Sequence, residues 1–322
     1  GRGRHNAGVK SAPTAFLALL LAAAASGAGP ANPPAMPDDI EGFRWARRDP
    51  GTGQILMLIA GKRGSPTGDL VRIEGPTITL FDRPSGTAPG RPSLPSTTTL
   101  TGDRGTYDKA AGLLTLDGHA VVTRSDGTVV RAEALSWSVT EGRFWTETYA
   151  EISDGSSTIS GSGLEGRMTD LPDVGRTLDR ITLQRDVRTG LTGAELLGLD
   201  DLFNVPSEKG PAGVTITCGG AMTYLRLASA IDYTEGVEAR DARRSLSARS
   251  LSLELGPDRR ITRLVATGGV RARGAQQEEA AGETFTWDAG SARALLSGTP
   301  YIRVQRPGGT IRAAGMVHDR AL

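Results

Sequence analysis

The sequence predicts an all-β protein, and three observations carry that prediction. A short sequence pattern recurs, in which a glycine and small apolar residues precede a run of alternating apolar and polar residues. The corresponding apolar residues of three copies are Val237, Val270 and Tyr301, which are 33 and 31 residues apart. Such a period indicates stacked supersecondary units, none of which buries its apolar face alone. The 322 residues include 43 Gly and 18 Pro with only 5% aromatics, and stretches such as 251–255 alternate apolar and polar residues. Many short strands joined by turns give this composition and this pattern.

The first residues have the features of an export signal. Basic residues up to Lys10 precede an apolar run at 15–25, and small residues follow it. This order is typical of a secretory signal peptide, and the run is shorter than the roughly 20 residues that a bilayer span needs. We predict a signal peptide over residues 1–28, with an uncleaved marginal anchor as the alternative, and a Pro-rich tether over residues 29–41.

Residues 42–192 contain the first series of predicted strands. Segments 70–73 and 77–81 alternate with period two. Asp117-Gly118 follows another such segment, and its glycine tolerates positive φ, so we expect a turn there. Ser125-Asp126-Gly127-Thr128 predicts a second turn. The segment as a whole is predicted to form one domain.

A short helix is predicted between two series of strands. Residues 193–203 gather Ala, Glu and Leu, although the stretch is short and contains glycine. A segment with two prolines follows, so residues 193–213 are predicted to be a linker that contains this helix. Strands resume at Val214, and residues 214–322 are predicted to form a second domain.

Period-two alternation gives each predicted strand one apolar and one polar face. Two sheets of such strands are expected to close against each other as a sandwich or flattened roll. The apolar residues are mostly Val, Leu, Ala and Ile. An interior of such residues either leaves a slot between the sheets or packs solid, and both alternatives stay open.

Composition argues against several classes of function. The net charge is +1, and the arginines are scattered, which disfavours nucleic acid as a partner and indicates solvated strand faces. Cys218 is the only cysteine, and His5, His119 and His318 are the only histidines, so neither a disulfide framework nor a metal site is expected. The chain has no nucleophile elbow, phosphate-binding loop or zinc-protease motif. We therefore predict a protein that is not an enzyme and has no cofactor.

Several phrases resemble two families of lipopolysaccharide transport proteins. Three phrases of the first half are similar to the LptC family, namely residues 101–108, 116–122 and 160–166. Four phrases of the second half are similar to LptA, the OstA-like bridge protein, namely residues 216–220, 233–237, 266–270 and 296–300. The resemblance covers about residues 42–321 in two consecutive parts, which are commonly separate proteins and here stand in one chain.

The resemblance implies a fold, a ligand and partners. The fold is two consecutive open β-jellyrolls of antiparallel strands, with a slot for lipid A acyl chains between the sheets. The partners are lipopolysaccharide, an inner-membrane ABC transporter complex of the Lpt type, and other OstA-like proteins that pair edge to edge. The location is the periplasm, with association to the inner membrane. Because the chain has no nucleotide site, energy for lipid movement is expected from the partner ATPase.

Apolar residues of the predicted strands are the candidates for lining such a slot, although for any single one of them an ordinary core position is the stronger interpretation. The candidates are Leu116, Val121, Leu135, Trp137, Ile216, Leu251, Leu253, Val270, Phe285, Trp287, Leu296, Ile302 and Val304. Near the C-terminus, residues 310–314 could present an unpaired edge to a second jellyroll. Ile311 is the candidate residue for this edge pairing.

Two other classes of function remain open. A secreted β-solenoid, acting as a scaffold or as an adhesin that binds polysaccharide, would share the repeats, the turns and the export signal. Its coils would be more uniform and near 20 residues. A secreted hydrolase could use paired carboxylates among Asp103, Asp108, Glu133 and Glu147, but solvated strand surfaces account for these residues better.

Overall fold

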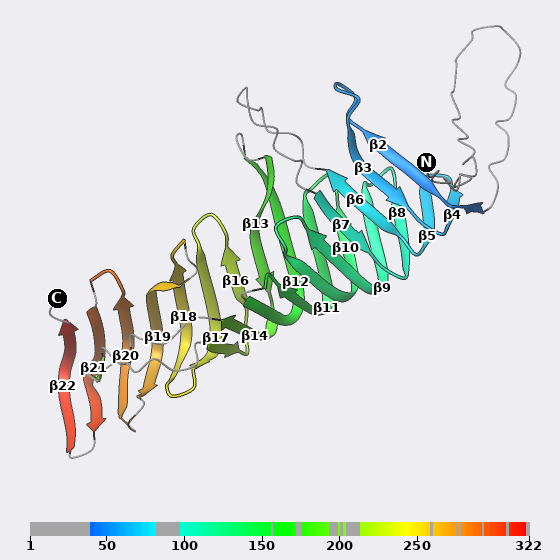
Figure 1. The fold of residues 1–322 in the computed structure, drawn as a ribbon. Helices are drawn as coiled ribbons and strands as arrows, with labels where there is room; N and C mark the ends of the chain where they lie inside the picture. The colour runs from blue at the N-terminus through cyan, green and yellow to red at the C-terminus, as the bar shows by residue number, and fades with distance from the viewer. Residues whose placement is uncertain are drawn as a thin grey trace, which may run out of the picture. The chain divides into compact units, whose positions relative to one another are not determined.

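The computed structural model describes an antiparallel β-protein (Figure 1). The described residues are 39–81, 97–155, 157–171, 175–192, 199, 202–203, 213–257, 260–274, 276, 278–291, 293–306 and 309–319. Within these ranges, no helix has the length and apolar character that crossing a membrane requires. The predicted export signal lies outside them, as does most of the predicted tether.

Twenty-two strands make up the described fold. The first fourteen are β1 (Ile40–Glu41), β2 (Arg44–Arg48), β3 (Ile55–Ala60), β4 (Arg63–Thr67), β5 (Leu70–Glu74), β6 (Thr77–Phe81), β7 (Thr97–Thr101), β8 (Arg104–Asp108), β9 (Leu113–Arg124), β10 (Val129–Ser138), β11 (Arg143–Ser153), β12 (Ser157–Leu171), β13 (Gly175–Leu183) and β14 (Arg185–Thr192). The others are β15 (Gly213–Cys218), β16 (Met222–Leu225), β17 (Ala230–Arg240), β18 (Ser245–Leu255), β19 (Ile261–Arg273), β20 (Glu279–Asp288), β21 (Arg293–Arg306) and β22 (Gly309–Asp319).

The N-terminal strands form two hydrogen-bonded layers, called leaf one and leaf two. Leaf one joins β1, β4, β5, β8 and the first part of β9. Leaf two joins β2, β3, β6, β7 and the last part of β9. From β9 onward, the long strands run through both leaves. The predicted all-β fold of antiparallel, jellyroll-like strands is confirmed.

Each long strand changes leaf at a bend, and the bend in β9 corrects one prediction. The predicted turn at Asp117-Gly118 is wrong, because β9 continues through it as one strand. Gly118 and His119 have φ angles of 72° and 50°. Positive φ at two successive residues redirects the strand without reversing it, and the pairing of β9 with β10 shifts register there. The predicted turn at residues 125–128 does connect β9 to β10.

The exposed bend of β9 carries an ion pair whose strength depends on pH. Nδ1 of His119 lies 2.9 Å from Oδ2 of Asp103, and this hydrogen bond and the Asp103 charge, with a further contribution from Glu133, raise the pKa of His119. A histidine pKa that is higher in the folded state than in the unfolded state stabilises the fold. This contribution is fully present at pH values below the unfolded pKa of about 6.5. It is lost as pH rises through the folded pKa.

We therefore expect an NMR titration of the His119 ring to give a pKa above that of an unperturbed histidine. The Asp103→Asn variant should lower this pKa, because the asparagine side chain carries no charge. A wild-type ring that titrates at or below the ordinary value would contradict the assignment.

The sheet is continuous between the two predicted domains. β13 and β14 pair with separate parts of β12, so that β13 continues leaf one and β14 continues leaf two. β16 pairs with β13 and β15 pairs with β14, and both then pair with β17. Residues 37–322 form one compact unit. The division into domains at residues 193–213 stays a prediction. Strands before and after this segment are hydrogen-bonded to each other, β13 to β16 and β14 to β15.

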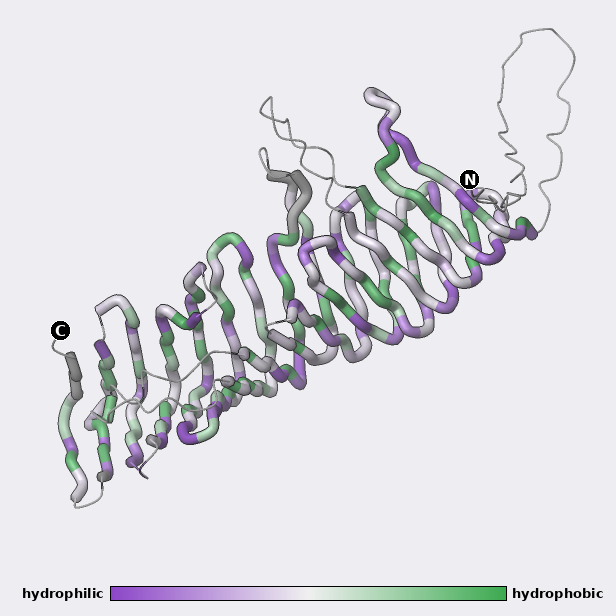
Figure 2. Tube along the Cα trace, viewed as in Figure 1, coloured by the Kyte–Doolittle hydropathy of each residue, from purple (hydrophilic) through white to green (hydrophobic). Residues whose placement is uncertain are grey.

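The core lies between the leaves and follows from the alternation of the strands. On β9, Leu114 and Leu116 of leaf one and Ala120 and Val122 of leaf two are buried. Apolar residues alternate with polar ones along most strands (Figure 2). Buried residues from β3 to β21 belong to a single cluster. Period-two alternation thus places one apolar face of each leaf against the other.

Most of the predicted linker helix lies outside the described residues. Leu199, Leu202 and Phe203 of this segment are described, and all three are buried. A Cβ atom added to Gly274 would lie 2.8 Å from Cδ2 of Phe203. Gly274 directly follows β19, on which Val270 and Ala272 are buried, and it continues their alternation toward the core. Phe203 therefore packs on the inner face of leaf two in the C-terminal half.

Candidate functional site

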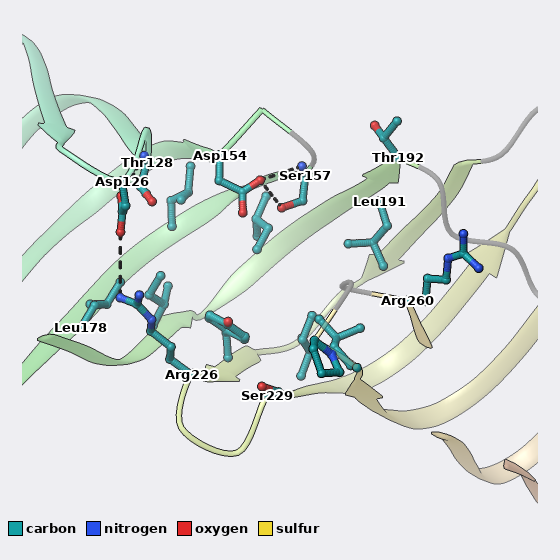
Figure 3. Close-up of a pocket in the computed structure, with 18 of the residues that line it drawn as sticks. Asp126, Thr128, Asp154, Ser157, Leu178, Leu191, Thr192, Arg226, Ser229 and Arg260 are labelled. Atoms are coloured by element: carbon teal, nitrogen blue, oxygen red, sulfur yellow. Dashed lines mark hydrogen bonds and ion pairs between the residues drawn. The ribbon is translucent and has the colours of Figure 1, made fainter. Parts of the chain in front are cut away.

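A cavity of about 460 Å³ lies between the leaves where the strands of the two sequence halves meet (Figure 3). Leaf two contributes the ends of β9, β11, β12 and β14. Leaf one contributes β13, β16 and the beginning of β17. The lining residues are Arg124, Asp126, Thr128, Ile152, Asp154, Ser157, Ile159, Leu178, Ile181, Leu191, Thr192, Tyr224, Arg226, Ser229, Ile231, Leu255, Gly256, Pro257 and Arg260.

The floor of the cavity is apolar and comes from both leaves. Ile152, Ile159 and Leu191 reach it from leaf two, and Ile181 and Ile231 reach it from leaf one. Each belongs to a strand whose alternate residues are buried; on β14, for example, the residues at 187, 189 and 191 are buried. The residues that line the cavity therefore follow the same alternation as the core residues. At the cavity, side chains from the two leaves leave space between them.

The rim of the cavity is polar and charged. Arg124 ends β9, Asp126 lies in the following turn, and Arg226 begins the turn between β16 and β17. Oδ2 of Asp126 lies 3.4 Å from Nη2 of Arg124 and 4.0 Å from Nη1 of Arg226. Elsewhere on the rim, Oδ1 of Asp154 accepts hydrogen bonds from the backbone N–H and the hydroxyl of Ser157, both at 2.9 Å.

The surroundings of Asp126 favour the ionised form of its carboxyl group. Burial alone would raise the pKa of its carboxyl group, but hydrogen bonds from Thr128 and the charges of Arg124 and Arg226 outweigh burial and hold the pKa below its ordinary value. The backbone N–H of Thr128 donates to Oδ1 at 3.0 Å. Asp126 is therefore a fixed negative charge between two guanidinium groups.

The arrangement can hold an amphiphile. Its floor provides apolar contacts from two sheets, and its rim provides charge. Among the described residues, no group of three or more His, Cys, Asp or Glu side chains is placed to hold a metal ion. Ligand pockets of about 300–1,000 Å³ with an apolar lining and a few polar groups are typical of small-molecule sites.

Residues 53–191 match the family described as lipopolysaccharide-assembly, LptC-related. This part of the chain is LptC-like. The match extends from β3 to β14, and it supports a role in lipopolysaccharide transport in general. No match was found among curated proteins. The resemblance of the C-terminal part to LptA stays a prediction.

The cavity lies where the LptC-like part meets the rest of the chain. Arg124, Ile159 and Leu191 belong to the matched residues, whereas Tyr224 and Ile231 lie beyond them. Both parts are thus needed to enclose it.

The slot-lining residues predicted from sequence lie outside the cavity, and all but one of them are in the core. Twelve of the thirteen are buried, namely Leu116, Leu135, Trp137, Ile216, Leu251, Leu253, Val270, Phe285, Trp287, Leu296, Ile302 and Val304. Val121 is half-buried between buried Ala120 and Val122, so it points away from the core. None of the thirteen lines the cavity. Whether any of them contacts lipid stays a prediction.

Ile311 lies on the last described strand. Its side chain is 53% exposed, and its partner across the ladder is Val304 of β21. Among the described strands, β22 pairs only with β21, so its other edge is open. This position agrees with a role in edge pairing, which remains a proposal.

The sequence prediction missed the cavity residues. Ile152, Ile159 and Ile181 lie within residues 42–192, the predicted first series of strands, but nothing in the local pattern separates them from other core residues. The charged residues at the ends of β9 and β16 were the available signal. Arg124 and Arg226 each stand immediately beyond an alternating run, and arginines at that point can border an apolar slot.

Proposed function

We propose that this chain is a non-catalytic periplasmic carrier that holds acyl chains of lipopolysaccharide between its leaves and passes them toward the outer membrane. The observation that supports this most is the apolar cavity between the two leaves. It lies at the C-terminal end of the LptC-like residues.

The physical need for such a cavity follows from the cost of wetting hydrocarbon. Each methylene group exposed to water costs about 0.8 kcal/mol, so ten methylenes cost roughly 8 kcal/mol. The floor residues Ile152, Ile159, Ile181 and Ile231 supply apolar contacts that offset this cost. Sugars and phosphates of the same lipid would remain at the polar rim or in solvent.

Movement along the chain requires more than the cavity. Beyond it, the residues between the leaves are closely packed, as Leu253, Phe285 and Leu296 are all fully buried. Lipid would therefore have to part the leaves as it advances. We propose that an inner-membrane ABC transporter of the Lpt type supplies the energy, and that the open edge of β22 continues the path into a second OstA-like protein.

The test is a photo-crosslinking amino acid at Ile159, on the cavity floor, in living cells. We expect covalent adducts with lipopolysaccharide at this position, because its side chain faces the cavity. The matched control is Tyr149, which belongs to the neighbouring strand β11 and is 57% exposed. It should give at least about tenfold fewer adducts. A tenfold ratio corresponds to a difference of about 1.4 kcal/mol in the free energy of lipid contact at the two positions.

Equal labelling at Ile159 and Tyr149, or no labelling at Ile159, would contradict the carrier proposal. Adducts with a polysaccharide that lacks acyl chains would instead favour a secreted scaffold or adhesin.

A further inference from the structure

One ion pair crosses the mouth of the cavity. Asp126 lies in the turn between β9 and β10 on leaf two, and Arg226 lies in the turn between β16 and β17 on leaf one. Figure 3 shows the two side chains joined across the space between their strands. Arg124 approaches the same carboxylate oxygen from leaf two. The β9–β10 turn of leaf two and the β16–β17 turn of leaf one are therefore linked through the carboxylate of Asp126.

Arg124 is unusually buried for a charged side chain. Its side chain is 12% exposed, and its Nε donor is buried with no hydrogen-bond partner among the described residues. A buried donor without a partner destabilises the fold, and more so when the group is charged. This donor lies in a residue that lines the cavity, so an acceptor that enters the mouth could satisfy it.

Two guanidinium groups share one carboxylate at the rim of the cavity. Arg124 and Arg226 both approach Oδ2 of Asp126. Asp154 already accepts two hydrogen bonds from Ser157. A phosphate group carries about −1.5 to −2 charges and three acceptor oxygens, so it suits two guanidinium groups better than a singly charged carboxylate does.

We propose that Arg124 and Arg226 bind the phosphate group of an amphiphile whose alkyl chain lies in the cavity. The phosphate takes the place of the Asp126 carboxylate between the two leaves. This inference rests on the proposed function, because it names the part of the lipid that the rim binds. Guanidinium groups make strong, paired hydrogen bonds to phosphate oxygens, and the cavity that these two arginines line also has an apolar floor.

The experiment is calorimetric titration of the full chain with dodecyl phosphate, dodecyl maltoside and inorganic phosphate, each below its micellar concentration. Dodecyl phosphate should bind at least about tenfold more tightly than dodecyl maltoside, since hydrogen bonds to a charged group are stronger than those to a neutral one. Inorganic phosphate should bind far more weakly than dodecyl phosphate, because it lacks the alkyl chain.

Variants separate the head group from the tail. Arg124→Gln and Arg226→Gln should each reduce dodecyl phosphate affinity about tenfold and leave dodecyl maltoside affinity unchanged. Asp126→Asn keeps the side-chain acceptor for Thr128 but removes the competing charge, so it should tighten dodecyl phosphate binding. Arg72→Gln, on an exposed position of β5 far from the cavity lining, is the matched control and should change neither affinity.

The outcomes distinguish this inference from the proposed function. Equal binding of the two detergents, or weaker dodecyl phosphate binding by Asp126→Asn, would overturn the phosphate site and leave the carrier proposal standing. Inorganic phosphate binding as tightly as dodecyl phosphate would overturn the amphiphile part. Binding of neither detergent would overturn both. If an arginine variant fails to fold, the opposite sign expected for Asp126→Asn still decides the question.

Discussion

Replacing Phe285 with alanine is expected to destabilise the protein by about 3–5 kcal/mol. Phe285 is fully buried, and on β20 it lies opposite Ala266 of β19 and Leu296 of β21. Its removal would leave a cavity that neighbouring strands, fixed by their ladders, cannot fill. The urea midpoint of unfolding, followed by circular dichroism and by tryptophan fluorescence, measures the loss.

The control for Phe285 is an apolar residue that already borders empty space. Leu191 lines the cavity and is 8% exposed, so fewer atoms surround it and its replacement by alanine should cost about 2 kcal/mol. If Phe285→Ala proved no more destabilising than Leu191→Ala, the C-terminal leaves would not be packed together. An open slot along Phe285, as the sequence analysis allowed, would then be the better description.

The all-β fold could be predicted from sequence because its cause is local. Alternation at residues such as 251–255 and turn residues such as Gly127 are visible in a few consecutive positions. The path of the long strands could not be predicted in the same way. Asp117-Gly118 has the composition of a hairpin turn, but its positive φ angles serve a bend between leaves, and only pairing with β7 and β8 decides between the two.

The candidate site is less predictable than the fold, for a physical reason. A cavity exists where two sheets stop filling each other, and this depends on strands far apart in sequence. Ile159, Ile231 and Leu253 have the same local pattern and all three are buried, yet only the first two line the cavity. Scattered arginines were interpreted as solvated, which fails for Arg124 because its position at the end of β9 places it at the mouth.

Proline at the open edge of β22 is expected to abolish pairing with a second jellyroll. In an antiparallel strand, successive N–H groups point to opposite edges, so of Thr310 and Ile311 one donates toward β21 and the other toward the open edge. Thr310→Pro and Ile311→Pro therefore remove different donors. One variant should lower the urea midpoint, and the other should leave it unchanged while losing assembly.

A photo-crosslinking amino acid at Ala314, which is exposed on the same strand, reports assembly in cells. We expect adducts with another OstA-like protein, reduced at least about tenfold by the proline variant that keeps its stability. Thr310→Ala and Ile311→Ala retain the backbone donors and should retain the adducts. If adducts persisted in both proline variants, or disappeared only together with folding, the open edge of β22 would not be the contact. Partners would then have to reach the protein through β1 or β2, each of which is paired with only one described strand.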